Sequence, residues 1–527
     1  MFYLYIFLAS FILSVILTSV VKKLAGRFNI VDKPDADRKI HGKPVPLLGG
    51  VAVFISFFVS LLFLSNRFLS GNLEWRHFLG FIIGALILVI GGFLDDKYNL
   101  KAQHQIIFPI LAVVAVIVGG VEIEKITNPL GGYIHLKQLI VVGPILIALW
   151  LLGMMYTTKL LDGVDGLVGG VGAIGGFVVF LFTLTTQYYQ PDIALAALLL
   201  ASVSLGFLIF NFHPAKIFLG EGGSLLFGYI LGVLAIISGG KIAIALLIMG
   251  IPILDVVWTI TRRLLQGKNP FRFADKKHLH FRLLDLGLSQ RQTVLVFYAM
   301  SLLFGLSGLF LQSKGKFLAL VILVIIMLAV VIFFWYLDRR NKRNKPDLLL
   351  HICCAPCGTY ITKEILLLKY NVTWYFYNSN LCSQEEYDKR LRYVKLMAKK
   401  YNIPLIIESY DHESWLRKIE GRESDPERGG RCQICYLDRL RATAELAKKE
   451  GFDFFCTTLL SSPYKDVDAV NRLSRDLAKS FQVPYLEWDF QANDGYRKSQ
   501  ELSKKLGLYR QKFCGCEFTD RYKKISK

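Results

Sequence analysis

Cysteine is absent from the first 352 residues of this 527-residue chain, and all nine cysteines follow that stretch. A disulfide scaffold places cysteines throughout the domain that it stabilises, so such a scaffold is excluded for most of the chain. Apolar runs long enough to cross a bilayer are confined to residues 1–337 and are absent from the C-terminal part of the chain. We therefore expect a membrane part at 1–337, a charged linker at 338–346 and a soluble part at 347–527.

The N-terminus lacks the basic segment and the cleavage site that mark a removable signal peptide. Its first residues run directly into apolar sequence, which predicts a first membrane span. Acidic residues are also scarce, with 41 Asp and Glu against 62 Lys and Arg, and the net charge is +21. Membrane lipid head groups suffice to explain the basic excess of the first part, and an anionic partner such as RNA would suit the second.

The apolar residues, 53% of the chain, predict a polytopic α-helical membrane domain of about 11 spans. The loops after the odd-numbered spans hold 19 Lys and Arg, whereas the other five loops hold 7. Because cytoplasmic loops are enriched in these residues, the first set should be cytoplasmic. This places the N-terminus outside the cell membrane and the soluble part in the cytoplasm. The predicted spans are 2–21, 47–65, 78–94, 106–119, 138–156, 166–184, 193–211, 224–237, 242–258, 293–311 and 317–337.

Polar clusters in the membrane part all fall in the loops predicted to be cytoplasmic. An acidic pair at a helix end is more often a solvated cap than a catalyst, but five clusters at one face favour an active site. Carboxylates suit Mg²⁺ held with substrate phosphates, and the basic residues suit the phosphates themselves. This set indicates phosphoryl transfer between a nucleotide donor and a lipid acceptor. The clusters include Arg38, Lys39, His41, Asp95, Asp96, Asp162, Asp165, Glu221, His278 and His280.

These motifs, in this order over residues 1–310, resemble the polyprenyl-phosphate N-acetylhexosamine-1-phosphate transferases. The resemblance implies a UDP-sugar donor, Mg²⁺, undecaprenyl phosphate as acceptor and UMP as leaving product. It favours UDP-N-acetylglucosamine as donor over the muramyl-pentapeptide nucleotide. The strings that carry it are Val31–Pro34, Arg38–Gly50, Gly91–Asp96, Leu161–Leu167, Asn211–Phe218, Pro252–Asp255 and His278–Phe281.

The resemblance also implies roles for individual residues. Asp95 and Asp96 would serve the lipid phosphate and its activation. The metal would be held by Glu221 and Asp162, and Asp165 would contact metal, phosphate or uridine. The donor would be bound through Phe218, stacked on uracil, and through His278 and His280 at the diphosphate. Further substrate contacts would come from Arg38, Lys39, His41, Asn211 and Lys159.

Three positions depart from the pattern of that family. Glu221 stands where aspartate is usual, and it keeps a carboxylate on a longer side chain. Tyr156 and Lys159 stand where asparagine is usual. Lys159 supplies a phosphate contact on one interpretation and marks a reduced or altered activity on the other.

In the soluble part, short apolar segments alternate with helical patterns, which predicts an α/β domain with a mostly parallel sheet. Seven cysteines lie in three tight clusters, and the first cluster follows the first predicted strand. Four thiolates suit zinc or an iron–sulfur cluster, and the surplus of cysteines favours redox chemistry. The lone Cys382 and Cys456 are expected to be buried fillers. The predicted strands are Leu348–Cys353, Val372–Tyr377, Leu405–Glu408, Phe452–Thr457 and Tyr485–Asp489.

Residues 347–520 resemble the QueH-type epoxyqueuosine reductases of tRNA modification. The resemblance rests on Leu350–Cys357, Glu386–Tyr387, Glu427–Gly429, Arg431–Cys432, Cys435, Thr457–Leu460, Ser462–Lys465, Asp494–Tyr496 and Tyr509–Cys516. It implies reduction of epoxyqueuosine in tRNA by a [4Fe-4S] cluster, with or without an additional iron, and an unidentified reductant. The expected cluster ligands are Cys353, Cys354, Cys432 and Cys435, with Cys357 as a replacement or as a ligand of the further iron. Cys514 and Cys516 would form a redox-active disulfide, and Arg428, Arg431, Lys465 and Arg510 would contact RNA.

Two other hypotheses stay open at this point. A transporter with a zinc-binding regulatory domain would also combine many spans with clustered cysteines, although its charges should lie within the membrane and not in loops at one face. Alternatively, one half is a degenerate scaffold, and Lys159 and Glu221 make the membrane half the candidate. The sequence itself does not connect the two chemistries.

Overall fold

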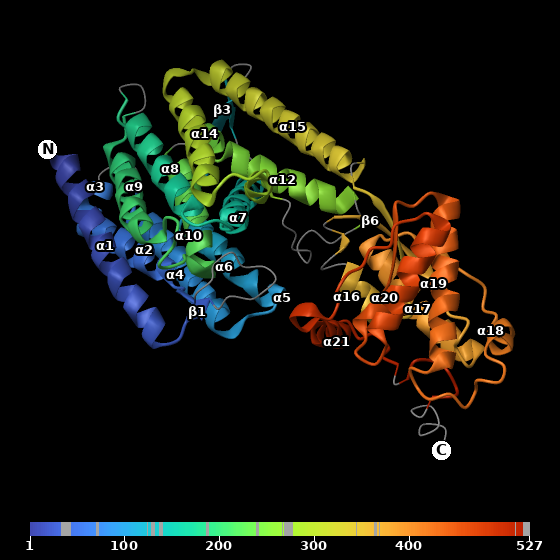
Figure 1. The fold of residues 1–527 in the computed structure, drawn as a ribbon. Coiled ribbons are helices and arrows are strands. Elements are labelled where there is room, and N and C mark those ends of the chain that lie inside the picture. Colours follow the sequence, from blue (N-terminus) through green and yellow to red (C-terminus); the bar gives the residue numbers. More distant parts are fainter. Residues whose placement is uncertain are drawn as a thin grey trace. The chain divides into compact units, whose positions relative to one another are not determined.

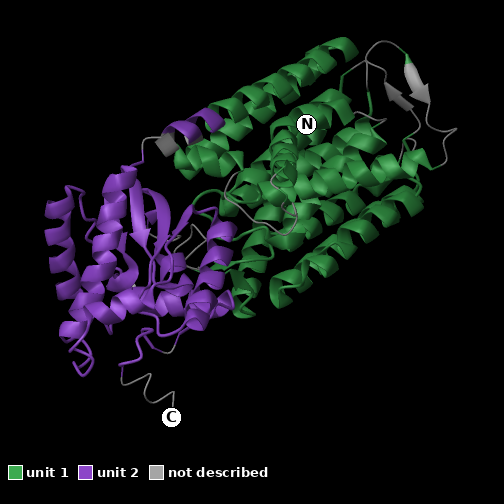
Figure 2. Ribbon diagram, turned by 90° about the vertical axis from the view of Figure 1, so that its right-hand side faces the viewer, with its two compact units in different colours: residues 1–334 green, residues 335–527 purple. Residues whose placement is uncertain are grey.

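The computed structural model divides the chain into two compact units, residues 1–334 and residues 335–527 (Figures 1 and 2). The structure describes residues 1–32, 44–69, 73–123, 125–127, 132–135, 141–185, 189–238, 242–265, 267, 278–343, 345–362, 366–367, 369–511 and 513–519. Of the predicted site residues, Arg38, Lys39 and His41 lie outside these ranges.

The first unit is a bundle of helices with two short antiparallel strand pairs, β1 (Val31–Asp32) with β2 (Val45–Pro46) and β3 (Lys125–Thr127) with β4 (Tyr133–His135). Its helices are α1 (Phe2–Arg27), α2 (Gly49–Phe63), α3 (Ser65–Phe68), α4 (Trp75–Tyr98), α5 (Ala102–Gln105), α6 (Ile107–Val118), α7 (Val142–Leu161), α8 (Leu167–Thr183), α9 (Pro191–Asn211), α10 (Gly220–Ile237), α11 (Ile242–Ile248), α12 (Gly250–Leu265), α13 (Leu279–Asp285), α14 (Gln290–Phe310) and α15 (Ser313–Arg343).

Seven helices of the described ranges are long and apolar enough to cross a membrane: α1, α4, α7, α9, α10, α14 and α15. The pair α11 and α12 adds an eighth span if it is counted as one element, although the two helices meet at 78°. Three further predicted spans correspond to the shorter apolar helices α2, α5–α6 and α8. The prediction of several membrane helices is therefore confirmed, whereas the count of eleven is not.

Glycines let three helices of this unit approach closely. A Cβ atom on Gly92 of α4 would lie 2.0 Å from the backbone nitrogen of Gly222 in α10, and a Cβ atom on Gly50 of α2 would lie 2.3 Å from Cα of Gly223. No side chain fits in either contact, so both positions require glycine. The contacts bring the C-terminal end of α4 next to the N-terminal end of α10.

The second unit holds a four-stranded parallel sheet in the order β7-β6-β5-β8, which confirms the predicted parallel sheet. The strands are β5 (Asp347–His351), β6 (Asn371–Phe376), β7 (Leu405–Ile407) and β8 (Phe454–Thr457). Leu348, Leu349 and Leu350 are consecutive and fully buried, as expected of a central strand covered on both faces. The helices are α16 (Ala355–Ile361), α17 (Gln384–Tyr401), α18 (His412–Lys418), α19 (Gly430–Glu450), α20 (Val467–Phe481) and α21 (Gly495–Lys505), with 3₁₀ turns η3 (Thr458–Ser461) and η4 (Ala492–Asp494).

The fifth predicted strand, Tyr485–Asp489, is not formed as a strand. The segment makes a single bridge, between Phe455 and Tyr485, supported by backbone bonds from Phe455 to Pro484 and from Leu486 to Phe455. Pro484 lacks a backbone N–H and cannot donate to a ladder at the start of the segment.

Candidate active sites

The first unit contains a cavity of about 1100 Å³ that gathers carboxylates from several elements. We call it the acidic cavity, and its acidic residues are Asp32, Asp95, Asp96, Asp162, Asp165 and Glu221. Asp95 and Asp96 lie in the last turn of α4, and Glu221 lies in the first turn of α10, the two helix ends joined by the glycine contacts. Asp162 and Asp165 belong to the short turn between α7 and α8.

Hydrogen bonds hold the aspartate pair in place. One oxygen of Asp95 accepts from the backbone N–H of Leu100 at 2.8 Å and from the side-chain amide of Gln105 at 3.1 Å. Asp96 accepts from the backbone N–H of Glu221 at 3.2 Å. The second bond joins two residues that are 125 positions apart in the sequence, so the geometry of the pair depends on how α4 and α10 pack.

Lys159, in the last turn of α7, forms an ion pair with Glu221, with Nζ and Oε2 2.6 Å apart. The ammonium also donates to the side-chain oxygen of Gln105 at 3.3 Å. Gln105 thus connects Lys159 with Asp95. Two of the three positions that depart from the sequence pattern of the transferases, Lys159 and Glu221, are in contact with each other.

Asp165 is held by the segment that follows α9. Its Oδ2 atom accepts from the backbone N–H of Ala215 at 3.0 Å and lies 2.8 Å from Nδ1 of His213. Phe218 also lines the cavity. Asn211 lines it as well, but its side-chain amide donates to the carbonyl of Ile217 at 2.9 Å, which fixes the turn that carries Phe218.

His278 and His280 stack on each other, with ring centroids 5.6 Å apart and planes inclined by 3°. Asp255 holds His278 through its Nδ1 atom at 2.8 Å and accepts from the backbone N–H of Leu279 at 2.9 Å. His280 is fully buried, and burial lowers its pKa to about 4, so its ring is neutral. Its two ring nitrogens have no hydrogen-bond partner among the described residues, and Nε2 lies against Gly163 in the turn of Asp162.

In the second unit, three cysteines come together where the central strand β5 ends and α16 begins. The sulfur atoms of Cys353, Cys354 and Cys357 all lie within 4.8 Å of one another. The neighbouring thiols of Cys354 and Cys357 lower the pKa of Cys353 well below its usual range, whereas the pKa of Cys354 rises to about 12. The group therefore favours one thiolate that its two neighbours stabilise.

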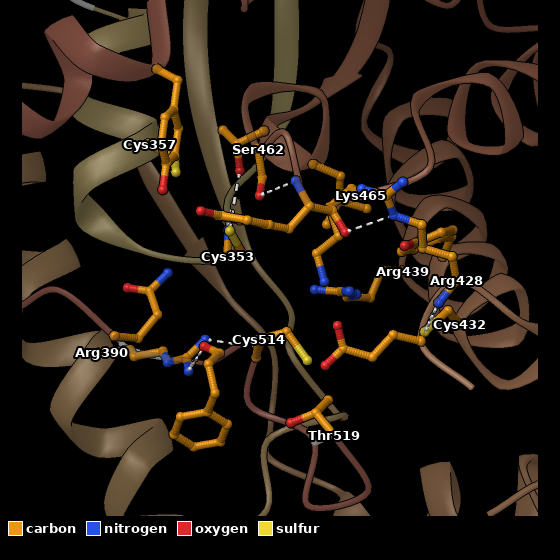
Figure 3. A pocket seen from close by; sticks show the side chains of 18 residues that line it. Cys353, Cys357, Arg390, Arg428, Cys432, Arg439, Ser462, Lys465, Cys514 and Thr519 are labelled. Carbon is orange, nitrogen blue, oxygen red and sulfur yellow. Dashed lines mark hydrogen bonds between the residues drawn. The ribbon is translucent and has the colours of Figure 1, made fainter. Parts of the chain in front are cut away.

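Two of these cysteines line a cavity of about 150 Å³, which we call the thiol pocket (Figure 3). Cys432, near the start of α19, and Cys514, from the C-terminal segment, line the same pocket. Four cationic side chains surround the sulfurs: Arg390, Arg428, Arg439 and Lys465. Positive charge next to thiolates stabilises their ionised, metal-binding form.

The remaining clustered cysteines lie outside the pocket lining. Cys435 is buried, and its sulfur accepts from Nη2 of Arg439 at 3.2 Å. Cys516 is buried in a small apolar cluster with Trp415 and Ile419. The nine cysteines are all free thiols in the structure.

Comparison with known proteins separates the chain at the same place. Residues 78–239 match the family described as Glycosyl transferase family 4, and residues 348–522 match Epoxyqueuosine reductase QueH. The "Probable undecaprenyl-phosphate N-acetylglucosaminyl 1-phosphate transferase" of Bacillus subtilis is 33% identical over 60% of this chain and 87% of its own length. "Epoxyqueuosine reductase QueH" of Streptococcus pyogenes is 35% identical over 34% of this chain and 73% of its own length. The protein of the same name from Haemophilus influenzae is 36% identical over 34% of this chain and 76% of its own length.

The chain belongs to both families. It is an enzyme of both classes, so the transporter hypothesis is set aside. The apolar helices and the membrane transferase relative make it a multi-pass membrane protein. From here on, residues 1–334 are the transferase unit and residues 335–527 the reductase unit.

Sequence reasoning missed three positioning residues of the transferase unit. His213 and Asp255 lie within recognised motifs but were not assigned a site role, and they hold Asp165 and His278. Gln105, which joins Asp95 to Lys159, lies in no motif. The aspartate inside the apolar helix α12 and the histidine directly after the apolar helix α9 were usable signals, whereas the glutamine in the short polar helix α5 was not.

In the reductase unit, Cys357 was expected as a replacement ligand or as a ligand of a further iron, and the structure places it with Cys353 and Cys354. Arg439 was missed, and the signal for it is its position four residues after Cys435 on the same helix face. The expected RNA contact at Arg431 is wrong, because that side chain is 1% exposed and donates to backbone carbonyls of Glu423 and Phe518. Cys456 is buried as predicted, whereas Cys382 is half-buried.

Proposed function

We propose that the transferase unit transfers N-acetylglucosamine 1-phosphate from UDP-N-acetylglucosamine to undecaprenyl phosphate and releases UMP. The observation that carries the proposal is the acidic cavity, in which six carboxylates and Phe218 line one space in a bundle of apolar helices. The name of the Bacillus subtilis relative supports the same donor sugar and acceptor.

The donor set of the acidic cavity fits Mg²⁺, which prefers carboxylate oxygens together with substrate phosphates. Asp162 and Glu221 would hold the ion, and its charge would offset that of the phosphates. Asp95 and Asp96 serve the acceptor phosphate, Asp96 with its position fixed by the backbone of Glu221. Phe218 offers a ring for uracil, with Asn211 holding its turn. Asp165, Lys159, His278, His280, Arg38, Lys39 and His41 complete the proposed set.

The transferase proposal is tested with the full chain purified in detergent. UDP-N-acetylglucosamine, undecaprenyl phosphate and Mg²⁺ are supplied, and UMP is measured; UDP-MurNAc-pentapeptide in a parallel reaction tests the alternative donor. Asp96→Asn should abolish UMP release, whereas Asp285→Asn, an exposed aspartate outside the cavity, should not. Failure of the wild-type chain to release UMP from any UDP-sugar would contradict the proposal.

We propose that the reductase unit reduces epoxyqueuosine to queuosine in tRNA. The observation that carries this proposal is the group of three sulfurs within 4.8 Å that shares the thiol pocket with Cys432 and Cys514. Thiolates suit a [4Fe-4S] cluster, which supplies electrons for a reduction. Cys353, Cys354, Cys432 and Cys435 are the proposed ligands, and Cys357 either replaces one of them or holds an additional iron.

The C-terminal cysteines are proposed as a dithiol that passes electrons from a reductant to the pocket. Arg390 supports their loop by donating to the carbonyls of Cys514 and Phe513 at 3.2 and 3.4 Å. Gly515 between the two cysteines has φ of +114°, which only glycine adopts readily. The turn between the two thiols therefore requires glycine at this position.

The rim of the thiol pocket suits RNA. Arg428 is exposed and Lys465 lines the pocket, so both can meet phosphate, and the exposed Arg510 lies near Cys514 in the sequence. Tyr464 and Tyr496 line the same pocket, with ring centroids 6.2 Å apart. Aromatic faces beside cations are the usual way in which proteins hold unstacked bases.

The reductase proposal is tested on the anaerobically purified full chain. Iron, sulfide and zinc are measured first, and conversion of epoxyqueuosine in tRNA is then followed by nucleoside mass spectrometry with a chemical reductant. Iron and sulfide in a ratio near one, together with queuosine formation, are expected. Stoichiometric zinc without iron would contradict this proposal.

We also propose that the N-terminus lies outside and the reductase unit in the cytoplasm of the cell. The excess of Lys and Arg in alternate loops and the cytoplasmic location of tRNA substrates support this orientation. Fusion of alkaline phosphatase, which is active only outside, tests it. The enzyme should be inactive at the C-terminus and active in the loop after α3, and the reverse pattern would contradict the proposal.

A further inference from the structure

The ion pair between Lys159 and Glu221 lies within the acidic cavity, and both side chains line it. The Lys159 side chain is 21% exposed and that of Glu221 is 40% exposed, so the pair faces the space that substrates would enter. At 2.6 Å the ammonium is in direct contact with Oε2 of Glu221. The same oxygen is therefore not free to bind a metal ion while the pair persists.

The cavity has a strong excess of negative charge. Six acidic side chains line it, and Lys159 is its single Lys or Arg among the described residues. The ammonium donates to Gln105, whose amide in turn donates to Asp95. Its partner Glu221 also donates a backbone N–H to Asp96, so Lys159 is linked to both members of the aspartate pair. Lys159 thus provides, from within the chain, the positive charge that such a cavity otherwise takes from a bound cation.

We propose that Lys159 and a divalent cation are alternative partners of Glu221, so that the cation binds only when the ammonium leaves this carboxylate. The inference rests on the proposed transferase function of the same cavity. Lysine is suited to this exchange because its side chain is flexible and its ammonium is a compact charge. The displaced ammonium stays tethered at the end of α7, where a substrate phosphate can take the place of Glu221 as its partner.

The ion pair also explains why Lys159 and Glu221, which both depart from the family pattern, occur together. A lysine beside a carboxylate that must bind metal lowers the affinity for the metal by competition. A glutamate carries its carboxylate one methylene further from the backbone than an aspartate. The longer side chain of Glu221 can therefore meet either the ammonium of Lys159 or an ion further into the cavity.

The experiment measures binding of Mn²⁺ alone, as a probe for divalent cations, to the full chain in detergent. Electron paramagnetic resonance reports the free Mn²⁺. Lys159→Gln should bind Mn²⁺ about fivefold more tightly than the wild type, as expected for the loss of one competing ion pair. Lys159→Arg keeps the charge and should stay near the wild-type affinity. Lys101→Gln is the matched control, because Lys101 is exposed and does not line the cavity.

A second comparison shows that Glu221 mediates the effect. In a Glu221→Gln background, the change Lys159→Gln should no longer tighten Mn²⁺ binding. Equal or weaker binding by Lys159→Gln in the Glu221 background would overturn the inference, and so would the absence of Mn²⁺ binding to both proteins. UMP release is measured separately. If the Mn²⁺ affinities follow the expected order but no UMP is released, the result contradicts the transferase function and leaves the exchange at Glu221 intact.

Discussion

At the scale of single residues, both sites depend on charged groups that are held by specific partners. Arg439 illustrates this in the reductase unit. Its side chain is 2% exposed, donates to the sulfur of Cys435 at 3.2 Å and to the backbone carbonyl of the same residue at 3.3 Å. A buried guanidinium is tolerated only with such partners, so Arg439 and Cys435 depend on each other.

Arg439→Met should destabilise the reductase unit by about 2 kcal/mol, because it leaves buried acceptors without a donor. Hydrogen exchange of the amides of α19 in the full chain measures this change. Arg475→Met provides the control: Arg475 forms an exposed ion pair with Glu487, and its loss should leave the protection of α19 unchanged. Equal protection of α19 in the Arg439→Met and wild-type chains would show that the buried pair contributes nothing.

His213 gives the corresponding prediction in the transferase unit. Loss of its contact with Asp165 in His213→Gln should lower kcat/KM for UMP release by about tenfold, in the range of a displaced catalytic group. His104→Gln, which changes an exposed histidine outside the cavity lining, should leave the rate unchanged. A rate for His213→Gln within a factor of about two of the wild type would remove His213 from the site.

The residues that carry chemistry could be named from the sequence, since carboxylates, histidines and cysteines stand in short motifs with recognisable spacing. Their pairing could not. Lys159 meets Glu221 across 62 positions and Asp96 meets the backbone of Glu221 across 125, and these distances are set by helix packing and not by local sequence. The same limit explains why Arg431 was expected at the surface. A charged residue is usually exposed, and only the fold shows that backbone carbonyls accept from the buried guanidinium of Arg431.

At the scale of elements, the acidic cavity depends on the close approach of α2, α4 and α10. Sequence analysis located the segments that became these helices because long apolar runs are a strong signal. Their ends differ from the predicted spans by up to four residues: α4 covers Trp75–Tyr98 against a predicted 78–94, and α10 begins at Gly220 against a predicted 224. Sequence analysis also predicted a strand at Tyr485–Asp489, where one bridge forms.

Gly92→Ala should separate α4 from α10, because the new Cβ would meet the backbone of Gly222 at 2.0 Å and not a flexible side chain. We expect a lower thermal midpoint in detergent and a fall in UMP release of about tenfold or more, since Asp96 would lose its bond to Glu221. Gly143→Ala in α7 is the control, as no atom lies within 4 Å of its added Cβ. Comparable activity of the two variants would show that the contact is not needed.

At the scale of the whole molecule, two units with separate cores carry separate sites. The acidic cavity is lined only by described residues of the transferase unit, and the thiol pocket only by those of the reductase unit. Neither site takes a residue from the other unit among the described ranges. Each reaction should therefore proceed when the other is disabled.

Removal of iron by an anaerobic chelator should stop queuosine formation and leave UMP release unchanged. Asp96→Asn should have the opposite effect, with normal iron content and normal queuosine formation. Both products are measured on the same preparations of the full chain, with untreated wild type as control. A loss of both activities in either arm would show that the two reactions are coupled.

The connection between the last apolar helix and the sheet of the reductase unit is very short. The helix α15, long enough to cross a membrane, ends at Arg343, and the sheet's central strand β5 begins at Asp347. Three intervening residues extend to roughly 10 to 14 Å at most. The reductase unit is thus tethered by a short segment to the last apolar helix of a multi-pass membrane protein. The tRNA substrate proposed above would therefore have to come to a membrane-anchored enzyme, so the rate of encounter would depend on the diffusion of the tRNA and on charge near the membrane, and not on free diffusion of the enzyme.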